Sequence, residues 1–200
     1  MDRTFIIGKD AVPEKVRLLA DEKLRWTLVC RNLSESAPAK VKTEIELCGP
    51  GAEADIAGLF LCLGNEDVLL DITVRHTSGG CTSRQLFKGV AGGGADVEFN
   101  GLIYVARDAQ KTRAYQECHS ILLSDKAEVQ TRPQLEIYAD DVECSHGATT
   151  GYLSPEEQFY MRSRGIPEAQ ARHLQIISFL SPVLRRLPEE MAYEIEESII

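Results

Sequence analysis

From Val41 to Ala139, apolar and polar residues alternate in short runs, and this period of two is typical of strands with one buried face. The runs are five to ten residues long, and no helical period separates them. Two shorter strands precede them, and residues 12–23 fit either a loop or one helical turn. The pattern predicts strands at 4–7, 26–30, 43–47, 54–63, 68–76, 82–90, 97–105, 114–123, 127–131 and 135–139.

The connections carry turn chemistry, and short phrases recur between them. Ala54-Asp55-Ile56, Ala95-Asp96-Val97 and Ala127-Glu128-Val129 lie at the start of three of these strands and resemble one another. Evenly spaced short strands with degenerate repeats favour a solenoid whose coils bury their inward residues on one another. A β-sandwich is the alternative fold. Aromatic residues make up only 6% of the chain, which favours a parallel β-helix over the sandwich.

After Gly151 the pattern changes from strands to helices. Ser154 followed by Pro155 and two glutamates predicts a capped helix start, and Pro167 and Pro188 precede two further helices. We therefore expect a β-helix core with short N-terminal strands over 1–151 and a small helical domain over 152–200.

The third predicted helix has an apolar stripe with little chain left to cover it. Met191, Ile195 and Ile199 recur at a spacing of four, which places them on one helix face. The stripe either packs back onto the β-helix or binds a partner protein. As candidate partner-binding residues we take Pro188, Glu189, Met191 and Ile195.

Candidate chemistry gathers just before the helices. In an extended strand Cys144 and His146 point to the same face, because side chains alternate. Cys118, followed by His119, lies about one coil earlier and would stack beside this pair. Thiolate and imidazole without a complete ligand set suit an open site for iron–sulfur chemistry or another soft metal. Nucleophilic catalysis by a Cys/His pair is the alternative.

Composition excludes several other functions. A net charge of -9 without a basic stripe argues against binding nucleic acid. The six cysteines include no Cys-x-x-Cys pair, so a closed zinc site is not expected, and His76 with Cys81 is more simply a structural pair. No apolar run is long enough to span a membrane, and the Met1 start lacks a signal-peptide core, so we expect a cytoplasmic protein.

Several strings resemble the SufB/SufD family of iron–sulfur cluster assembly scaffolds. The resemblance covers roughly residues 70 to 190. The strings that carry the resemblance include Lys88-Gly89-Val90, Phe99-Asn100-Gly101, Thr131-Arg132-Pro133-Gln134-Leu135-Glu136-Ile137, Cys144-Ser145-His146-Gly147-Ala148-Thr149 and Phe159-Tyr160-Met161-Arg162-Ser163-Arg164-Gly165-Ile166.

The resemblance implies a right-handed parallel β-helix and a helical domain that docks on a SufC-type ATPase. The chain itself would be a scaffold and not an enzyme. His146 matches the histidine of SufD-type sequences that is proposed to face a transient cluster at a subunit interface, and Ser145 and Gly147 replace the glutamates of SufB.

Cys118 departs from a plain SufD pattern because it matches the scaffold cysteine of SufB. The chain thus resembles both halves of a site that the paired proteins divide between them. This suggests a homodimer in which Cys118 of one subunit faces His146 of the other; a distinct SufB/SufD-like partner is the other possibility. A purely structural subunit without cluster ligands is the competing role, and the roles of His76, Cys81, His119 and Cys144 stay open.

Overall fold

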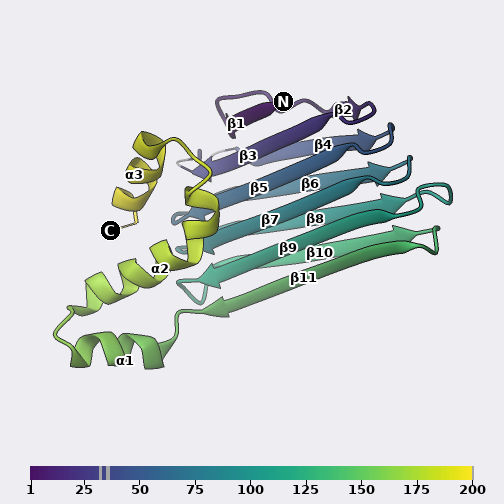
Figure 1. Ribbon diagram of the computed structural model, residues 1–200. Helices are drawn as coiled ribbons and strands as arrows, with labels where there is room; N and C mark the ends of the chain where they lie inside the picture. The colour runs from purple at the N-terminus through teal and green to yellow at the C-terminus, as the bar shows by residue number, and fades with distance from the viewer. Residues whose placement is uncertain (32, 35–36, 200) are drawn as a thin grey trace.

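The structure is a computed structural model that describes residues 1–31, 33–34 and 37–199. Eleven strands are followed by three helices (Figure 1). The strands are β1 (Asp2–Ile6), β2 (Lys15–Leu18), β3 (Lys23–Arg31), β4 (Ala39–Leu47), β5 (Glu53–Cys62), β6 (Asp67–His76), β7 (Thr82–Ala91), β8 (Asp96–Val105), β9 (Thr112–Leu122), β10 (Glu128–Ile137) and β11 (Val142–Tyr152).

The strands wind into a parallel β-solenoid, which confirms the predicted fold and excludes the sandwich. Odd-numbered strands form one sheet in the order β1-β3-β5-β7-β9-β11, here called sheet A, and even-numbered strands form sheet B in the order β10-β8-β6-β4-β2. Residues in equivalent positions of neighbouring coils lie about 30 apart, as in the hydrogen bond between His119 and Thr149, 30 residues apart. The turns also stack, because a Cβ on Gly93, with a φ of 58°, would come within 2.3 Å of the carbonyl oxygen of Gly64.

The solenoid interior is apolar and tightly packed by a few aromatic rings. Phe87 lies over Gly58, and Phe60 lies over Gly89, each ring within 2.2 Å of where a Cβ on that glycine would be. Phe87 also contacts Phe99 across the interior, with ring centroids 4.6 Å apart. Glycine on one strand thus makes room for phenylalanine on its neighbour, and the low aromatic content suffices for a close-packed core.

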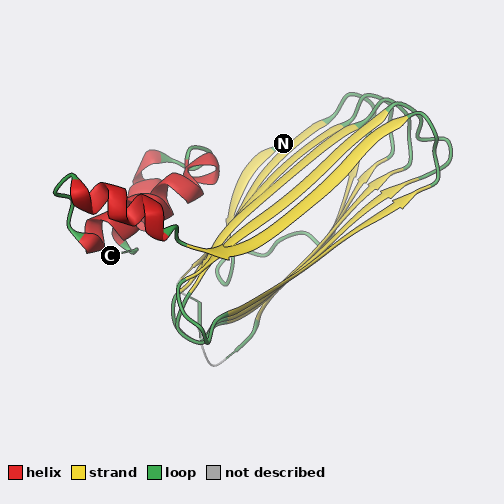
Figure 2. Cartoon of the chain, turned by 90° about the horizontal axis from the view of Figure 1, so that it is seen from below, coloured by secondary structure: helices red, strands yellow, loops and turns green. Residues whose placement is uncertain are grey.

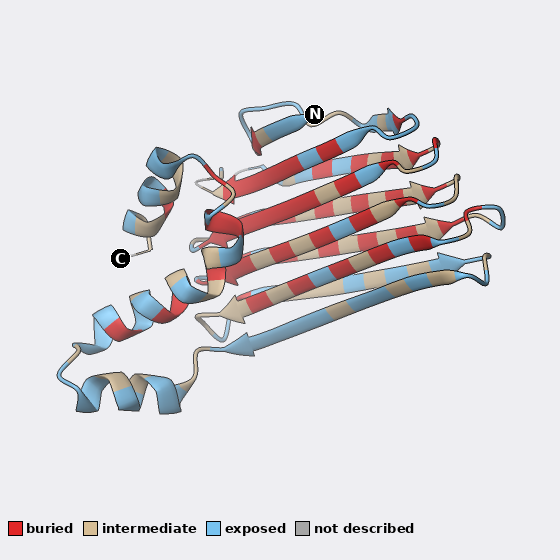
Figure 3. Cartoon of the chain, viewed as in Figure 1, coloured by how far each residue is buried: buried red, intermediate tan, exposed pale blue. Residues whose placement is uncertain are grey.

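Burial decreases sharply at the last coil (Figure 3). The inner faces of β4 to β9 are almost wholly buried, whereas β10 and β11 are half-buried or exposed along their length. Within the described residues no strand pairs with the outer edge of either β10 or β11. We call this face, formed by β10 and β11, the open end.

Three predicted boundaries were wrong, and the position of β10 at the open end explains the first of them. β10 runs unbroken through Pro133, where a break was expected; proline is tolerated because this is an edge strand, whose free side needs no N–H donor. β11 continues through Gly147 and Gly151 instead of loosening there. Residues 12–23 contain the short strand β2 and no helical turn.

The helices begin where the sequence predicts. They are α1 (Pro155–Ser163), α2 (Glu168–Leu184) and α3 (Glu189–Glu197), and Figure 2 shows them gathered at one side of the solenoid, near one end of its strands. The Ser154 side chain accepts a hydrogen bond from the Glu157 N–H at 3.2 Å, as expected of a helix cap. No helix of the described chain is long and apolar enough to cross a bilayer.

The helices pack on the outer face of sheet A rather than standing apart. Apolar side chains of α2 and α3 share a cluster with outward residues of β3, β5 and β7, among them Leu59 and Val90. Just after α2, Arg186 donates to the Asp55 carboxylate at 2.7 Å and to the Asp55 carbonyl at 3.2 Å. On α3, Ile195 is fully buried in this cluster and Met191 packs against it. The apolar stripe of α3 therefore covers the chain's own sheet.

Candidate functional site

The register of the last two strands of sheet A brings the candidate residues onto one surface. In the parallel pairing, His146 of β11 lies beside Gln116 of β9, and Ala148 lies beside Cys118. Gln116 and Cys118 are buried in the interior, and paired residues of neighbouring strands share a face, so His146 also lies on the inner face. Cys118 and His146 are thus diagonal neighbours within one chain, with Cα atoms about 8 Å apart from strand spacing and rise.

Cys118 is enclosed by the last coil. Its side chain is 1% exposed, between Phe87 on the deeper strand and Ala148 on the outer one. Burial raises the pKa of the Cys118 thiol to about 12, although a hydrogen bond with Ser120 opposes the shift. The thiol is therefore protonated at neutral pH in this conformation, and a metal or an opening of the last coil is needed to generate the thiolate.

His146 is the accessible member of the group. It is exposed on the inner face of the last strand because no further coil covers that face in the described part of the chain. Cys144 lies two residues earlier on the same face, half-buried against the apolar cluster of Ile103 and Val105. Burial also raises the pKa of the Cys144 thiol, opposed by a backbone hydrogen bond from Ala114. The open end thus presents one exposed imidazole with a shielded thiol on either side.

The other candidate histidines and cysteines lie elsewhere. His76 and Cys81 are both fully buried, but no contact joins their side chains: His76 Nε2 lies 2.9 Å from Ser83 Oγ, and the Cys81 thiol donates to the Gly49 carbonyl at 3.2 Å. Burial lowers the pKa of His76 to about 4. These contacts fit structural roles for both residues.

His119 lies on the outer face of sheet A, opposite to Cys118. Its Nδ1 is 2.8 Å from Thr149 Oγ1, and its Nε2 is 3.3 Å from Glu117 Oε2. The adjacency of Cys118 and His119 in the sequence therefore does not bring their side chains together, because successive residues of a strand point to opposite faces.

No three His, Cys, Asp or Glu side chains of the described residues are grouped so that they could hold a metal ion. Cys118 and His146 supply two donors at most from one chain, and a soft metal normally takes four. The remaining ligands would have to come from a second subunit, from inorganic sulfide or from solvent.

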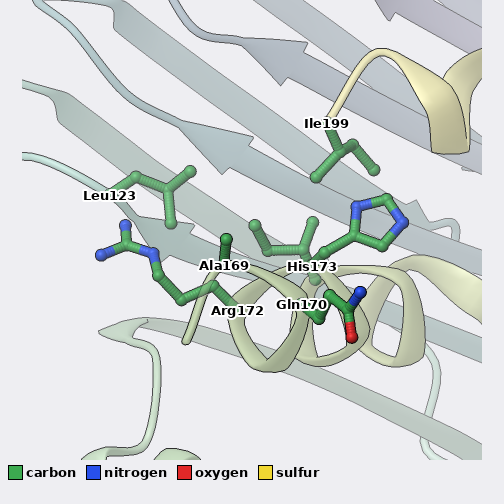
Figure 4. A pocket seen from close by; sticks show the side chains of 7 residues that line it. Leu123, Ala169, Gln170, Arg172, His173 and Ile199 are labelled. Carbon is green, nitrogen blue, oxygen red and sulfur yellow. The ribbon is translucent and has the colours of Figure 1, made fainter. Parts of the chain in front are cut away.

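Two cavities lie among the helices. One, of about 410 Å³, separates α2 from Leu123 and Ile199, and Figure 4 shows His173 and Arg172 at its rim. The other, of about 610 Å³, lies between α1 and α2 and is lined largely by apolar atoms of Tyr160, Met161 and Leu174. Beside it Phe159 is 74% exposed. An exposed aromatic surface of this kind is typical of a protein-binding site.

Two buried glutamines belong to the site and were not predicted. Gln85 and Gln116 occupy paired inner positions of β7 and β9, and Gln116 Nε2 donates to Gln85 Oε1 at 3.0 Å. The strand alternation alone places both side chains inside, in the same row as His146. A polar residue at an inward position was the sequence signal that could have identified them.

Comparison with known proteins gives the family. Residues 13–179 match the family described as "SUF system FeS cluster assembly, SufBD core domain". The chain is 40% identical over 148 residues to the iron–sulfur cluster assembly protein SufD of Escherichia coli, which covers 74% of this chain and 35% of that protein. It is 31% identical over 170 residues to SufD of Bacillus subtilis, covering 85% and 38%.

A plant relative shows the same partial coverage. The chloroplastic protein ABCI7 of Arabidopsis thaliana is 34% identical over 183 residues, which cover 85% of this chain and 38% of that protein. The chain thus spans less than half the length of these relatives. Because the family model matches most of the chain, and strands β3 to β11 with α1 lie within the match, this protein belongs to the SufBD family of iron–sulfur cluster assembly proteins.

Proposed function

We propose that the chain is a scaffold subunit that holds a nascent iron–sulfur cluster, or its sulfur, near Cys118 and His146 at a subunit interface. The observation that carries this proposal is the register of β9 and β11, which sets a thiol and an imidazole diagonally on one face of the open end. Membership of a family described by iron–sulfur cluster assembly indicates the cluster as the bound group. Sulfur and nitrogen donors are suited to binding such a cluster.

The raised thiol pKa values favour a scaffold over a cysteine hydrolase or transferase. A nucleophilic cysteine needs a depressed pKa or an adjacent base, whereas burial raises the pKa of Cys118 to about 12 and that of Cys144 above its ordinary value. A metal ion removes this obstacle by displacing the thiol proton. Cys118 is therefore suited to binding a metal once it is exposed.

A second subunit at the open end would complete the site. The half-buried inner faces of β10 and β11 and their unpaired edges are the kind of surface that pairs with a like strand. A two-fold axis there would bring His146 of one copy towards Cys118 of the other. A distinct SufB/SufD-like subunit could complete the site in the same way. We propose the homodimer because this single chain carries both ligands, Cys118 and His146.

A SufC-type ATPase would bind on the helical side. Of the four residues first proposed for this contact, Ile195 and Met191 pack against the chain's own sheet. Only Pro188 and Glu189 of that set are exposed. We place the main contact instead on the exposed aromatic surface of α1 and α2 around Phe159 and Tyr160. The ATPase activity would belong to that partner.

Anaerobic reconstitution with ferrous iron and sulfide tests the scaffold role. We expect the wild type to gain visible cluster absorbance, and Cys118→Ala and His146→Ala each to lose it while the far-ultraviolet circular dichroism stays unchanged. Cys62→Ala is the matched control, because Cys62 is equally buried on sheet A but lies far from the open end. Full absorbance in either test variant would refute the ligand assignment.

The same measurement separates the scaffold from a structural subunit. A chain that only completes a complex would gain no cluster absorbance even as the wild type. In that case Cys118 would be an ordinary buried thiol, and the role of the open end would be association alone.

A further inference from the structure

The inward residue paired with His146, Gln116, carries a buried polar atom without a hydrogen-bond partner. The Gln116 side chain is 1% exposed, and its amide nitrogen donates to Gln85, but its carbonyl oxygen Oε1 is buried without a hydrogen-bond partner. A buried acceptor that is left unpaired costs about 1–3 kcal/mol. Such an atom calls for a donor close by.

The position of the Gln116 amide is fixed from two sides. Its nitrogen is held by Gln85 at 3.0 Å. A Cβ on Gly101 of the facing sheet would lie 2.4 Å from the amide atoms of Gln116, so the side chain extends across the interior and lies against the Gly101 backbone. Any larger residue at position 101 would displace it. The oxygen is therefore held in one place.

Of the neighbouring donors, His146 is the one free to turn towards this oxygen. Gln85 Nε2 also has no partner, but Gln85 presents its oxygen to Gln116, and the Cys118 thiol hydrogen-bonds with Ser120. Towards the open end, Gln116 is paired with His146 on sheet A, and Gly101 is paired with Pro133 on sheet B. Proline has no N–H, and Ala114, the next inward residue of β9, has an apolar side chain. An imidazole always carries at least one ring N–H.

We propose that Gln116 is a positioning residue for His146: the exposed imidazole turns inward from the position described, and its ring N–H then donates to Gln116 Oε1. With that proton fixed, the other ring nitrogen carries the lone pair and is directed to the open end. This hydrogen bond holds the ring in one tautomer and one orientation. Acceptors behind metal-binding histidines have the same effect in general. Gln85 acts one step further back by holding the amide of Gln116. The benefit to cluster binding rests on the proposed function, whereas the hydrogen bond itself does not.

Nitrogen-15 NMR of the ring nitrogens tests the hydrogen bond in the metal-free protein. His146→Ala identifies the His146 signals among the four histidines. At a pH where the imidazole is neutral, we expect one protonated and one unprotonated nitrogen shift in the wild type. Gln116→Met keeps the side-chain length but removes the acceptor. In this variant we expect the two ring-nitrogen shifts of His146 to move towards each other, because the two tautomers then mix.

Ser120→Ala is the matched control, because it removes another buried side-chain oxygen from the inner face of β9, away from His146. We expect it to retain the wild-type shifts. Averaged shifts in the wild type, or unchanged shifts in Gln116→Met, would overturn the proposal. Should Gln116→Met not fold, the wild-type spectrum decides alone. A fixed tautomer in a protein that assembles no cluster would retain the hydrogen bond and refute only the proposed function.

Discussion

At the open end, the alternation of side chains along each strand decides which face a residue lies on. The burial of that side chain then decides its chemistry. The alternating pattern of β9 and β11 was enough to predict that Cys144 and His146 share a face and that Cys118 stacks beside them. It could not predict that Cys118 is enclosed and His146 exposed, because depth depends on where the stack of coils ends. Nor did it identify Gln116, since the role of a buried amide depends on what lies across the interior.

The pH dependence of stability should carry the signature of His76. Burial lowers its pKa from 6.5 to about 4 in the folded state, so between these values the unfolded chain binds the extra proton. The His76 contribution is fully present above pH 6.5, is lost as the pH falls towards 4, and is constant below that. The shift corresponds to about 3 kcal/mol.

Urea unfolding of the wild type and His76→Gln at several pH values between 7 and 4 measures this contribution. The variant keeps a polar side chain for Ser83 but cannot titrate. We expect the free energy of unfolding of the wild type to fall more steeply towards acid than that of His76→Gln. Parallel curves would show that His76 titrates alike in both states.

At the scale of elements, local signals predicted the helices well and the strands less exactly. Ser154, Pro155, Pro167 and Pro188 marked three helix starts because caps and prolines act within one turn. Strand ends are set by pairing with the neighbouring coil, so β10 continues through Pro133 and β11 through two glycines. The docking of the helices on sheet A depends on contacts such as Arg186 with Asp55, which are 131 residues apart.

Arg186 should anchor the helical segment to the solenoid. Its guanidinium is largely buried, with a side-chain exposure of 12%, and bonds both the carboxylate and the carbonyl of Asp55. Hydrogen bonds to charged groups contribute about 1.5–3 kcal/mol. We expect Arg186→Met to lower the free energy of unfolding in urea by that amount. Arg185→Met is the matched control, because Arg185 is the exposed neighbour, and an equal loss in both variants would contradict the anchor.

For the whole molecule, the repeated strand pattern predicted the solenoid, and the match to known proteins confirms the family that the strings between Lys88 and Ile166 resemble. The proposed homodimer depends on the surface of the last coil, and the alternation within single strands does not predict where the stack of coils ends. The inner face of the last coil is half-buried or exposed, and no strand of the described residues pairs with its edges. Both properties favour association through the open end.

A pair of lysine substitutions on β10 tests where subunits meet. Thr131 lies on the inner face, beside Phe99 of β8, whereas Gln134 lies on the outer face beside Leu102. Thr131→Lys would bury a charge in an interface at the open end, which is costly, and Gln134→Lys would not. We expect light scattering after gel filtration to show a dimer for the wild type and Gln134→Lys, and a monomer for Thr131→Lys. A Thr131→Lys dimer would place the interface elsewhere.

The missing cover over β10 and β11 also sets the order in which the fold loosens. In a stack of coils each layer is stabilised by its neighbours, and a terminal layer has only one. Backbone amides of β11 should therefore exchange with deuterium sooner than those of β7, which lies between two coils. Opening of this one layer uncovers Cys118 while the rest of the solenoid stays folded. We therefore expect a partner bound at the open end to limit how often the Cys118 thiol becomes exposed.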